Sequence, residues 1–418
     1  MNILFITMGT FYDLDLHGIY PDLMRCLRDH GHDVTILGAY PRALHKKEEI
    51  IEKQGVTFVH TVIGNVEKCS PIEKGMSMLF LENQFIKTAR KYLNNKRFDL
   101  VLYATPPITF VGVIHYIKKR NNAHTYLMLK DIFPQNAVDI GLIGKGGMIY
   151  KYFRRKEKKL YAISDTIGCM SEANVDYVLR NNLQEVKDKV EVCPNAIEVC
   201  NIETTDGNKE KIRLKYGLPL ETVVFVYGGN LGRPQGISFV IECLEQMVYL
   251  SDAFFLIIGN GTEYHKLETF MSKYRPRNVK LLPAIPRDEY NLLISACDIG
   301  LIFLDYRFTI PNFPSRLLAY MQVKLPIFAV TDKNTDIGKV IVDGGFGWWC
   351  ESNNAGEFKR MVKVIVSVLS EPEMYGIAEE MKQREWEYLN KHFSVENVYE
   401  IIMRRVRTVG ICCGNDIG

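Results

Sequence analysis

The stretch TVVFVYGGNLGRPQGISFVIECLEQMVYL, residues 222–250, contains three structural signals in succession. Residues 222–227 are a short apolar run typical of a buried strand, residues 228–232 are rich in glycine, and residues 237–250 carry apolar side chains at helical spacing. This order is typical of a parallel sheet covered by helices. Glycines between strand and helix let the backbone approach an anion, so the stretch predicts a phosphate loop. A tight turn without ligand is the alternative.

The same strand, turn and helix unit recurs along the chain. In the second half we predict strands at residues 253–258, 279–282, 299–304 and 326–330, with helices at 263–274, 287–296 and 314–323. In the first half we predict strands at residues 3–7, 33–37, 56–60, 100–103, 125–129 and 166–169, and a helix at 21–29. The pattern predicts an α/β fold of two Rossmann-like, doubly wound parallel-sheet domains that face a central cleft.

A polar stretch after residue 195 is the expected domain boundary. We predict an N-terminal domain over residues 1–195 and a C-terminal domain over residues 196–385. Residues 386–407 are expected to form a helix that crosses back to the N-terminal domain, followed by a tail at residues 408–418.

Composition narrows the classes of function. The 418 residues are 47% hydrophobic and 24% charged, as in folded proteins, and the net charge of +3 gives no support for nucleic-acid binding. The ten cysteines lack zinc-ligand spacing, so we expect no metal and a reduced, cytoplasmic protein. No secretory signal and no run of about 18 apolar residues is present, so any membrane contact is expected to be peripheral.

Two arginines are candidates for binding phosphate. Arg233 lies in the first glycine loop, and Arg316 follows Ser315, which is expected to cap a helix. Loops at the carboxyl ends of parallel strands form the ligand crevice, so both arginines are predicted to share a diphosphate. A surface arginine on a capped helix is the alternative for Arg316. The turn of Gly259 and Gly261 is a weaker candidate, because such turns are common.

The N-terminal half offers candidates on two loops. Tyr12, His17 and Gly18 lie in the loop after the first strand, where Gly18 would permit close approach of a substrate. A satisfied loop histidine is the alternative for His17. Asp131 follows a buried strand, where a carboxylate can contact substrate hydroxyls, and helix capping is its alternative.

A basic segment at residues 145–159 interleaves aromatic side chains with seven cations. A basic amphipathic helix is typical of contact with an anionic bilayer or a lipid-linked diphosphate. A solvated helix face is the alternative. Cys412 and Cys413 are expected to lie in a frayed end rather than to carry a lipid.

Four segments carry a resemblance to a known family: HGIYPDLMRCLRDHGHDVTIL from His17, LKDIFPQNAVDIGLI from Leu129, GGNLGRPQG from Gly228 and FPSRLLAYMQVKLPIFA from Phe313. They resemble a glycine loop with its helix, a D-x-[WF]-P segment and two donor segments of the retaining GT-B glycosyltransferases of family 4. The resemblance is closest to the branch that builds bacterial capsule and O-antigen polysaccharides.

The resemblance implies transfer of a hexosyl or N-acetylhexosaminyl group from a nucleotide diphosphate sugar, with UDP favoured. The implied acceptor is a polyprenyl-diphosphate-linked oligosaccharide, bound mainly by the N-terminal domain at the inner face of the plasma membrane. No cofactor and no metal are implied, because helix amides and cations would neutralise the leaving diphosphate.

The resemblance also implies roles for individual residues. Catalytic roles fall on Arg233, Arg316 and Asp131. The resemblance places Gly18, Gly229, Asn230, Ile285 and Ser315 at the donor. From the residues themselves we add Gly259, Gly261 and Thr309 as donor-binding candidates, and Tyr12 and His17 as acceptor-binding candidates.

This chain departs from the family pattern in the second donor segment. Pro311 and Ala319 stand where relatives usually carry two glutamates, and Gln235 stands where they often carry lysine. Thr309 is one candidate to replace the lost sugar contacts. The missing glutamates keep two alternatives open, a catalytically inactive relative that binds sugar nucleotides and a GT-B nucleotide-sugar epimerase.

Overall fold

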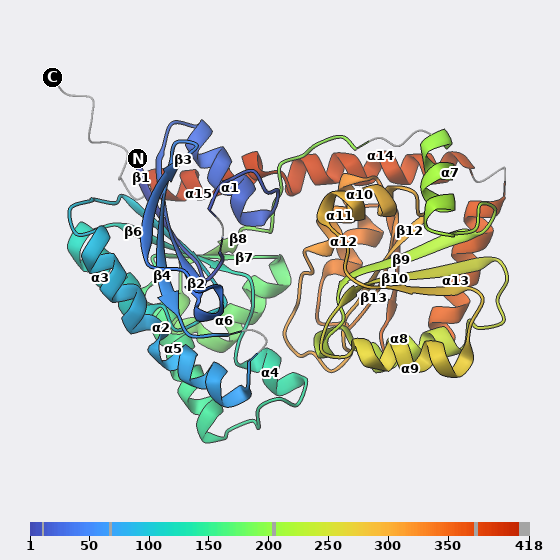
Figure 1. Ribbon diagram of the computed structural model, residues 1–418, viewed down its shortest axis with the longest axis horizontal. Helices are drawn as coiled ribbons and strands as arrows, with labels where there is room; N and C mark the ends of the chain where they lie inside the picture. Colours follow the sequence, from blue (N-terminus) through green and yellow to red (C-terminus); the bar gives the residue numbers. More distant parts are fainter. Residues whose placement is uncertain (11, 67–68, 203–205, 372–374, 409–418) are drawn as a thin grey trace. The chain divides into compact units, whose positions relative to one another are not determined.

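The computed structural model describes residues 1–10, 12–66, 69–202, 206–371 and 375–408. The chain forms two compact units (Figure 1). The N-terminal unit holds Met1–Glu198 and the chain from Ser394 onward, and the C-terminal unit holds Val199–Phe393. The chain leaves and re-enters the N-terminal unit at one place, because the backbone N–H of Val395 donates to the carbonyl of Ile197 at 3.0 Å. The divisions therefore fall at 198/199 and 393/394, rather than at the predicted 195/196 and 385/386.

The N-terminal unit is built on an eight-stranded sheet of order β3-β4-β2-β1-β5-β6-β7-β8. Its strands are β1 (Asn2–Ile6), β2 (Asp33–Pro41), β3 (Glu49–Lys53), β4 (Val56–Ile63), β5 (Leu100–Ala104), β6 (His124–Leu129), β7 (Thr166–Cys169) and β8 (Val190–Val192). All neighbours are parallel except the edge strand β3, which pairs antiparallel with β4. Every residue of β5 and β6 is buried, as expected for strands covered on both faces.

Helices cover this sheet and complete its core. They are α1 (Ile19–Asp29), α2 (Pro71–Tyr92), α3 (Val111–Asn121), α4 (Gln135–Asp139), α5 (Met148–Ile163), α6 (Glu172–Val186) and α15 (Val395–Thr408). The apolar face of α15, with Val398 and Ile402, joins the same core as Leu23 and Leu27 of α1. The last helix of the described chain therefore belongs to the N-terminal unit and lies along α1 (Figure 1).

The C-terminal unit has a six-stranded parallel sheet of order β11-β10-β9-β12-β13-β14. Its strands are β9 (Val223–Asn230), β10 (Ala253–Asn260), β11 (Val279–Leu282), β12 (Ile299–Phe303), β13 (Ile327–Thr331) and β14 (Gly347–Glu351). Its helices are α7 (Asp206–Lys215), α8 (Ile237–Glu245), α9 (Tyr264–Tyr274), α10 (Arg287–Ser295), α11 (Arg316–Gln322), α12 (Ile337–Asp343), α13 (Ala355–Ser370) and α14 (Tyr375–His392).

Three of the glycines that are expected in turns, Gly228, Gly229 and Gly259, belong to strands. β9 continues through Asn230 and pairs with β10 up to Asn260. The two backbones approach so closely that a Cβ on Gly259 would collide with the carbonyl of Gly229, and one on Gly261 with that of Leu231. The predicted turns therefore begin later than expected, after Asn230 and Asn260, because glycine in a strand also marks a close approach of backbones.

The C-terminal helical stretch is broken rather than continuous. α14 ends at His392, and Ser394 opens α15 by accepting the N–H of Asn397 on its hydroxyl at 3.3 Å. The helix that lies in the N-terminal unit therefore starts at Val395 and not at residue 386. Residues 409–418, with Cys412 and Cys413, lie outside the described residues.

Candidate functional site

Arg316 lies beside the carboxyl end of β9. It is the first residue of α11, and its guanidinium carbon stands 4.1 Å from the ring centroid of Tyr227. A Cβ on Gly229 would lie 3.6 Å from its Nη2, and the φ of +119° at Gly229 favours glycine. The bare backbone of Gly229 thus lies directly against the cation.

Two more tyrosines enclose this arginine. The hydroxyl of Tyr320, one turn along α11, accepts the N–H of Gly228 at 3.2 Å and donates to the carbonyl of Leu301 at 3.1 Å. Tyr290 of α10 fills the space over Gly228, where any Cβ would collide with its ring. The strand end, α10 and α11 are therefore fixed around one guanidinium.

The charge of Arg316 is not compensated by an acid. Within the described chain no carboxylate lies within 4.0 Å of it, and its buried Nη1 has no hydrogen-bond partner. Burial acts to lower the pKa of Arg316, but the nearby hydroxyls of Tyr227 and Tyr320 outweigh it, so the pKa lies above its ordinary value. Arg316 is half-buried and its Nη1 is covered, and a permanent cation in such a place without an acid is costly, so an anionic ligand would reduce this cost. The arrangement could hold an anion.

Arg233 has different surroundings. It is 53% exposed, and its Nε lies 3.9 Å from the carboxylate of Glu263, which Lys266 holds more tightly at 2.8 Å. No contact links Arg233 to Arg316 within the described residues, so the predicted pairing of the two on one diphosphate stays a prediction.

The contacts of Gln235 account for a glutamine, rather than a lysine, at this position of the glycine loop. Its side-chain oxygen accepts from the amide of Asn230 and from the backbone N–H of Gly232, both at 3.3 Å. A lysine could not accept either hydrogen bond. Gln235 therefore braces the loop that carries Arg233.

The remaining donor candidates of the C-terminal unit have mostly structural surroundings. Gly259 serves the close packing of β9 and β10, and Gly261 lies against the backbone of Leu231, just beyond these strands. Ser315 occupies the N-cap position of α11, but its hydroxyl makes no capping hydrogen bond, so that expectation was wrong; the backbone of Ser315 is itself helical. Ile285 is half-buried before α10, and Thr309 is exposed.

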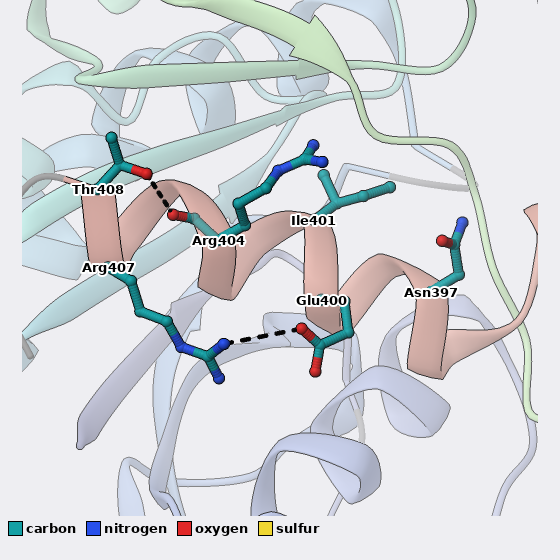
Figure 2. Close-up of a pocket in the computed structure, with 6 residues that line it drawn as sticks. All are labelled: Asn397, Glu400, Ile401, Arg404, Arg407 and Thr408. Carbon is teal, nitrogen blue, oxygen red and sulfur yellow. Dashed lines mark hydrogen bonds and ion pairs between the residues drawn. The ribbon is translucent and has the colours of Figure 1, made fainter.

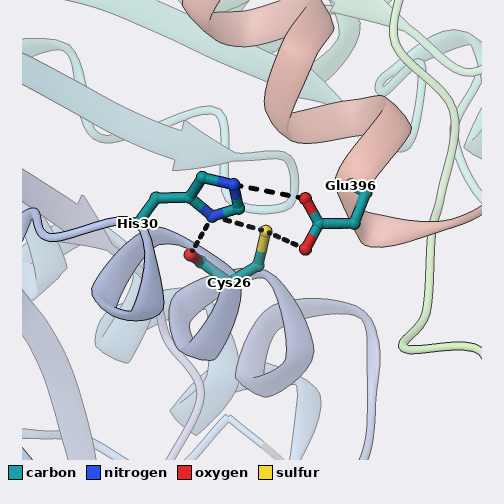
Figure 3. Close-up of side chains that lie close together, drawn as sticks. All are labelled: Cys26, His30 and Glu396. Atoms are coloured by element: carbon teal, nitrogen blue, oxygen red, sulfur yellow. Dashed lines mark hydrogen bonds and ion pairs between the residues drawn. The ribbon is translucent and has the colours of Figure 1, made fainter.

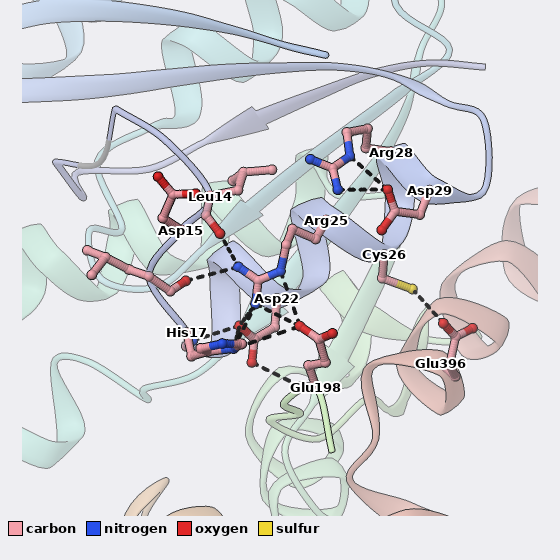
Figure 4. A network of polar contacts seen from close by, with 12 residues as sticks. Leu14, Asp15, His17, Asp22, Arg25, Cys26, Arg28, Asp29, Glu198 and Glu396 are labelled. Atoms are coloured by element: carbon pink, nitrogen blue, oxygen red, sulfur yellow. Dashed lines mark hydrogen bonds and ion pairs between the residues drawn. The ribbon is translucent and has the colours of Figure 1, made fainter. Parts of the chain in front are cut away.

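In the N-terminal unit, Arg25 and Asp22 of α1 hold the loop that contains His17 and Gly18 (Figure 4). The backbone N–H of Gly18 donates to Asp22 at 2.8 Å, and that of Glu198 donates to the same carboxylate at 2.9 Å. Arg25 donates to Asp22, to Glu198 at 2.9 Å and to the carbonyls of Leu14 and Leu16. Its Nη2 lies 3.0 Å from Nδ1 of His17.

These contacts indicate a structural role for the loop that contains His17 and Gly18. The N–H of Gly18 is used inside the loop, and His17 belongs to a fixed polar network. The structure therefore gives both residues a structural role, and their predicted contacts with substrate stay predictions.

Tyr12 lies in an aromatic group at the ends of β2 and β4. Its ring centroid is 5.7 Å from that of Tyr40 and 5.8 Å from that of His60, and the ammonium of Lys46 stands 4.0 Å above it. The cation already covers one face of the predicted acceptor-binding ring.

Asp131 follows β6 and is held by the amide of Asn136, whose Nδ2 donates to both carboxylate oxygens at 2.7 Å. It does not cap α4, whose N-cap is Pro134. Burial raises the pKa of Asp131 to about 6 despite the hydrogen bonds to Ile132 and Asn136. A carboxyl that titrates near neutrality suits proton transfer or contact with hydroxyls.

The sequence reasoning missed the tyrosine group and the α1 network. Tyr320 stands four residues after Arg316, and Arg25 three residues after Asp22, so helical spacing alone could have suggested both pairs. Tyr290 lies on another helix and left no such signal.

A shallow pocket lies elsewhere, on the outer face of α15 (Figure 2). Its lining comes from that single helix and includes Arg404, Ile401 and the pair of Arg407 and Glu400 at 3.8 Å. It contains none of the predicted site residues.

Two doubly wound α/β units joined in this order, with the chain returning to the first, are the architecture of the GT-B class. Residues 22–199 match the model of Glycosyltransferase Family 4, and residues 208–383 match that of Glycosyl transferases group 1. The chain therefore belongs to the GT-B glycosyltransferases of group 1 and family 4.

Similar proteins agree with this assignment. The Pseudomonas aeruginosa protein named probable glycosyltransferase WbjE is 24% identical over 70% of this chain and 72% of its own. WcaI of Escherichia coli (strain K12), named for colanic acid biosynthesis, is 21% identical over 58% of this chain and 60% of its own. A sucrose-phosphate synthase from Thermosynechococcus elongatus has a TM-score of 0.74 at 14% identity, with 98% of each chain covered. HepE of Anabaena, solved with UDP, has a TM-score of 0.69 at 15% identity, covering 98% of this chain and 100% of its own. At these identities the two structures show the fold alone.

Proposed function

We propose that this glycosyltransferase moves a sugar from a nucleotide diphosphate sugar to a lipid-linked oligosaccharide, with retention at the anomeric carbon. One observation carries the donor part of the proposal: Arg316 is charged, has no acidic partner within 4.0 Å among the described residues, and lies against the bare backbone of Gly229. A diphosphate fits this arrangement, because a guanidinium and an unobstructed backbone can bind phosphate oxygens together.

In the proposed reaction the bond between the anomeric carbon and the β-phosphate oxygen breaks. The acceptor hydroxyl oxygen bonds to that carbon on the same face, and its proton passes to the departing phosphate. Arg316 stabilises the negative charge that develops on the leaving diphosphate. Arg233 is proposed as a second cation, and Asp131 as a contact to the sugar or acceptor. Tyr12 and His17 are proposed to contact the acceptor.

UDP is the favoured nucleotide, and a surface polysaccharide is the favoured product. HepE, which shares the fold, was solved with UDP, and WcaI is named for colanic acid biosynthesis. Both facts concern those proteins, and they support the proposal through the shared fold and family.

Peripheral contact with the inner face of the plasma membrane is part of the proposal, and one face of α5 supports it. Met148, Lys151, Tyr152, Arg155 and Lys159 are all exposed and recur at helical spacing. Within the described chain, none of the three cations has an ion pair, whereas Arg154, Lys156 and Lys158 are paired to Glu157, Glu82 and Glu185. Exposed apolar side chains beside unpaired cations suit an anionic bilayer. Among the described residues, no helix is both long and apolar enough to cross a bilayer.

The donor site is tested by nucleotide binding. Thermal unfolding is followed with UDP, GDP, ADP and dTDP, because a ligand of the native state raises the Tm. We expect one nucleotide class to stabilise the wild type and the Arg360→Ala control, whose arginine pairs with Glu357 on the surface of α13. The same nucleotide should not stabilise Arg316→Ala. Equal shifts in all three proteins would contradict the anion site.

The reaction is tested with nucleotide sugars, with and without extracted lipid acceptor. Transfer that requires the acceptor supports the proposal. An epimerised or free sugar formed without acceptor would indicate the epimerase, and binding without any turnover would indicate an inactive relative.

Membrane contact is tested by vesicle flotation. Charge reversal at Lys151, Arg155 and Lys159 should abolish flotation with anionic vesicles at low salt. The matched control reverses Lys339, Lys363 and Lys391, three exposed cations of the C-terminal unit.

A further inference from the structure

Three side chains of types that can bind a metal ion meet between α1 and α15, within the N-terminal unit (Figure 3). Cys26 lies on α1, His30 follows four residues later, and Glu396 lies in the first turn of α15. The Sγ of Cys26 is 3.6 Å from Oε1 of Glu396, and the Nε2 of His30 is 3.3 Å from Oε2. All three donor groups lie within 4.8 Å of one another.

The imidazole is oriented as in a metal ligand. Its Nδ1 lies 2.9 Å from the carbonyl of Cys26, so we assign the ring proton to Nδ1 and a lone pair to Nε2. The ring stacks on Tyr399 with centroids 3.9 Å apart, which fixes its plane. Nδ1 is also 3.8 Å from Sγ of Cys26, which in turn lies 3.9 Å from the carbonyl of Val395.

We propose that Cys26, His30 and Glu396 bind a divalent, thiophilic cation of the zinc type. Zinc holds sulfur at about 2.3 Å and nitrogen or oxygen at about 2.0–2.2 Å in a tetrahedron, which places neighbouring donor atoms roughly 3.3–3.7 Å apart. Both separations from Glu396 lie in this range, and because they involve its two different oxygens, the carboxylate would turn to present one oxygen to the ion. The fourth position is left to water, because His30 and Glu396 are 34% and 65% exposed.

The charge around the site favours a cation. Glu396 has no lysine or arginine partner among the described residues, whereas Asp29 and Glu198, the other acids near Cys26, are paired with Arg28 and Arg25. The second cluster of metal-binding groups, His17 with Asp22 and Glu198, differs in this respect. There the guanidinium of Arg25 already donates to both carboxylates. Of these two clusters, only that of Cys26, His30 and Glu396 has no arginine or lysine paired with its carboxylate among the described residues.

A bound ion would link α1 to α15. It would fasten the segment in which the chain returns to the N-terminal unit, independently of the reaction at Arg316. The inference therefore does not rest on the proposed function.

The test uses the full chain, stripped of metal, in a Cys412→Ser, Cys413→Ser background that removes an adjacent pair of thiols. Titration with Co²⁺ should give one equivalent, with a thiolate charge-transfer band and the visible bands of tetrahedral cobalt, and Zn²⁺ should displace it. His30→Gln and Glu396→Gln should each weaken Zn²⁺ binding by more than about 100-fold. The matched control, Cys200→Ser with His265→Gln, removes an exposed thiol and an exposed imidazole and should bind like the parent.

Folding is checked in each variant by circular dichroism, and both glutamine variants alter partly exposed groups. Zn²⁺ should raise the Tm of the parent and the control, but not that of Glu396→Gln. Absence of a thiolate band, or equal affinity in parent and variants, would overturn the inference and indicate adventitious binding only.

Discussion

Arg25 in the N-terminal unit and Arg316 in the C-terminal unit are both enclosed arginines at helix surfaces, but their surroundings are opposite. Arg25 donates to two carboxylates, Asp22 and Glu198, and to two loop carbonyls. Arg316 has three tyrosines around it and no carboxylate within 4.0 Å in the part of the chain described.

The difference separates structure from binding. A guanidinium whose charge is neutralised within the fold holds a loop in place and has little left to offer a ligand. A guanidinium that the fold encloses but does not neutralise imposes a free-energy cost that an anion removes. The comparison predicts that removing Arg316 affects the reaction, and removing Arg25 affects folding.

The largest expected effect is that of Arg316→Ala on transfer. Loss of one charge-stabilising donor in an active site lowers kcat by about 10²–10³-fold. The free energy of unfolding should change by less than about 1 kcal/mol, since no buried acid loses its partner. Steady-state kinetics and urea unfolding of the same preparation check both expectations. A variant that unfolds easily and retains its kcat would reverse the comparison.

Much of the fold could be predicted from sequence because its signals are local. Short apolar runs such as residues 100–103 and 299–304 coincide closely with β5 and β12, since burial on both faces requires continuous apolar sequence. The edge strand β3 gives no such signal, because Glu49–Lys53 has only two apolar residues, Ile50 and Ile51, among three charged ones.

The site could be predicted only in part. Arg316 and Gly229 are candidates from sequence because a cation and a glycine after a strand are residue types that can bind phosphate. Their meeting across α11 and β9, and the enclosure by Tyr290, depend on tertiary packing, which residue spacing does not encode. The same limit applies to Gly259, which looked like a ligand turn and serves strand packing.

The second prediction concerns Arg25→Ala. It leaves the carboxylate of Asp22, which is 1% exposed, with two backbone N–H donors and no cation. Breaking a buried pair in this way costs about 3–5 kcal/mol, so the free energy of unfolding should fall by about 3 kcal/mol. Chemical denaturation measures it. Arg28→Ala is the matched control, because Arg28 pairs with the exposed Asp29 and should lose less than about 1 kcal/mol.

Glu385 provides a third test, because it too is an ionisable group without a partner of opposite charge inside the fold. It is fully buried on α14, neither carboxylate oxygen has a hydrogen-bond partner, and burial raises its pKa well above the ordinary value. Unlike an arginine, it can become neutral by binding a proton. A raised pKa contributes stability at low pH that is lost as the pH rises toward the folded-state pKa.

Glu385→Gln should therefore be more stable than the wild type at neutral pH, by roughly 1–3 kcal/mol, with the difference shrinking toward pH 4. Thermal unfolding from pH 4 to pH 8 measures the two curves. Glu387→Gln, an exposed change on the same helix, serves as control. Parallel curves for Glu385→Gln and the wild type would show that Glu385 finds a partner in solution.

The smallest effect is expected for Arg233→Ala. Its side chain is half exposed and lies 3.9 Å from Glu263, so the ion pair contributes less than about 1 kcal/mol to stability. Because Arg233 is proposed as a second cation, its removal should still weaken nucleotide binding by a few-fold, and this loss should shrink at high salt, because exposed charges are screened. The loss in Arg316→Ala should persist at high salt, because its guanidinium is enclosed. Calorimetric titration of nucleotide at low and high salt compares the two arginines directly. Equal salt dependence in both variants would mean that Arg316 reaches solvent as freely as Arg233, and the enclosure by the three tyrosines would lose its functional meaning.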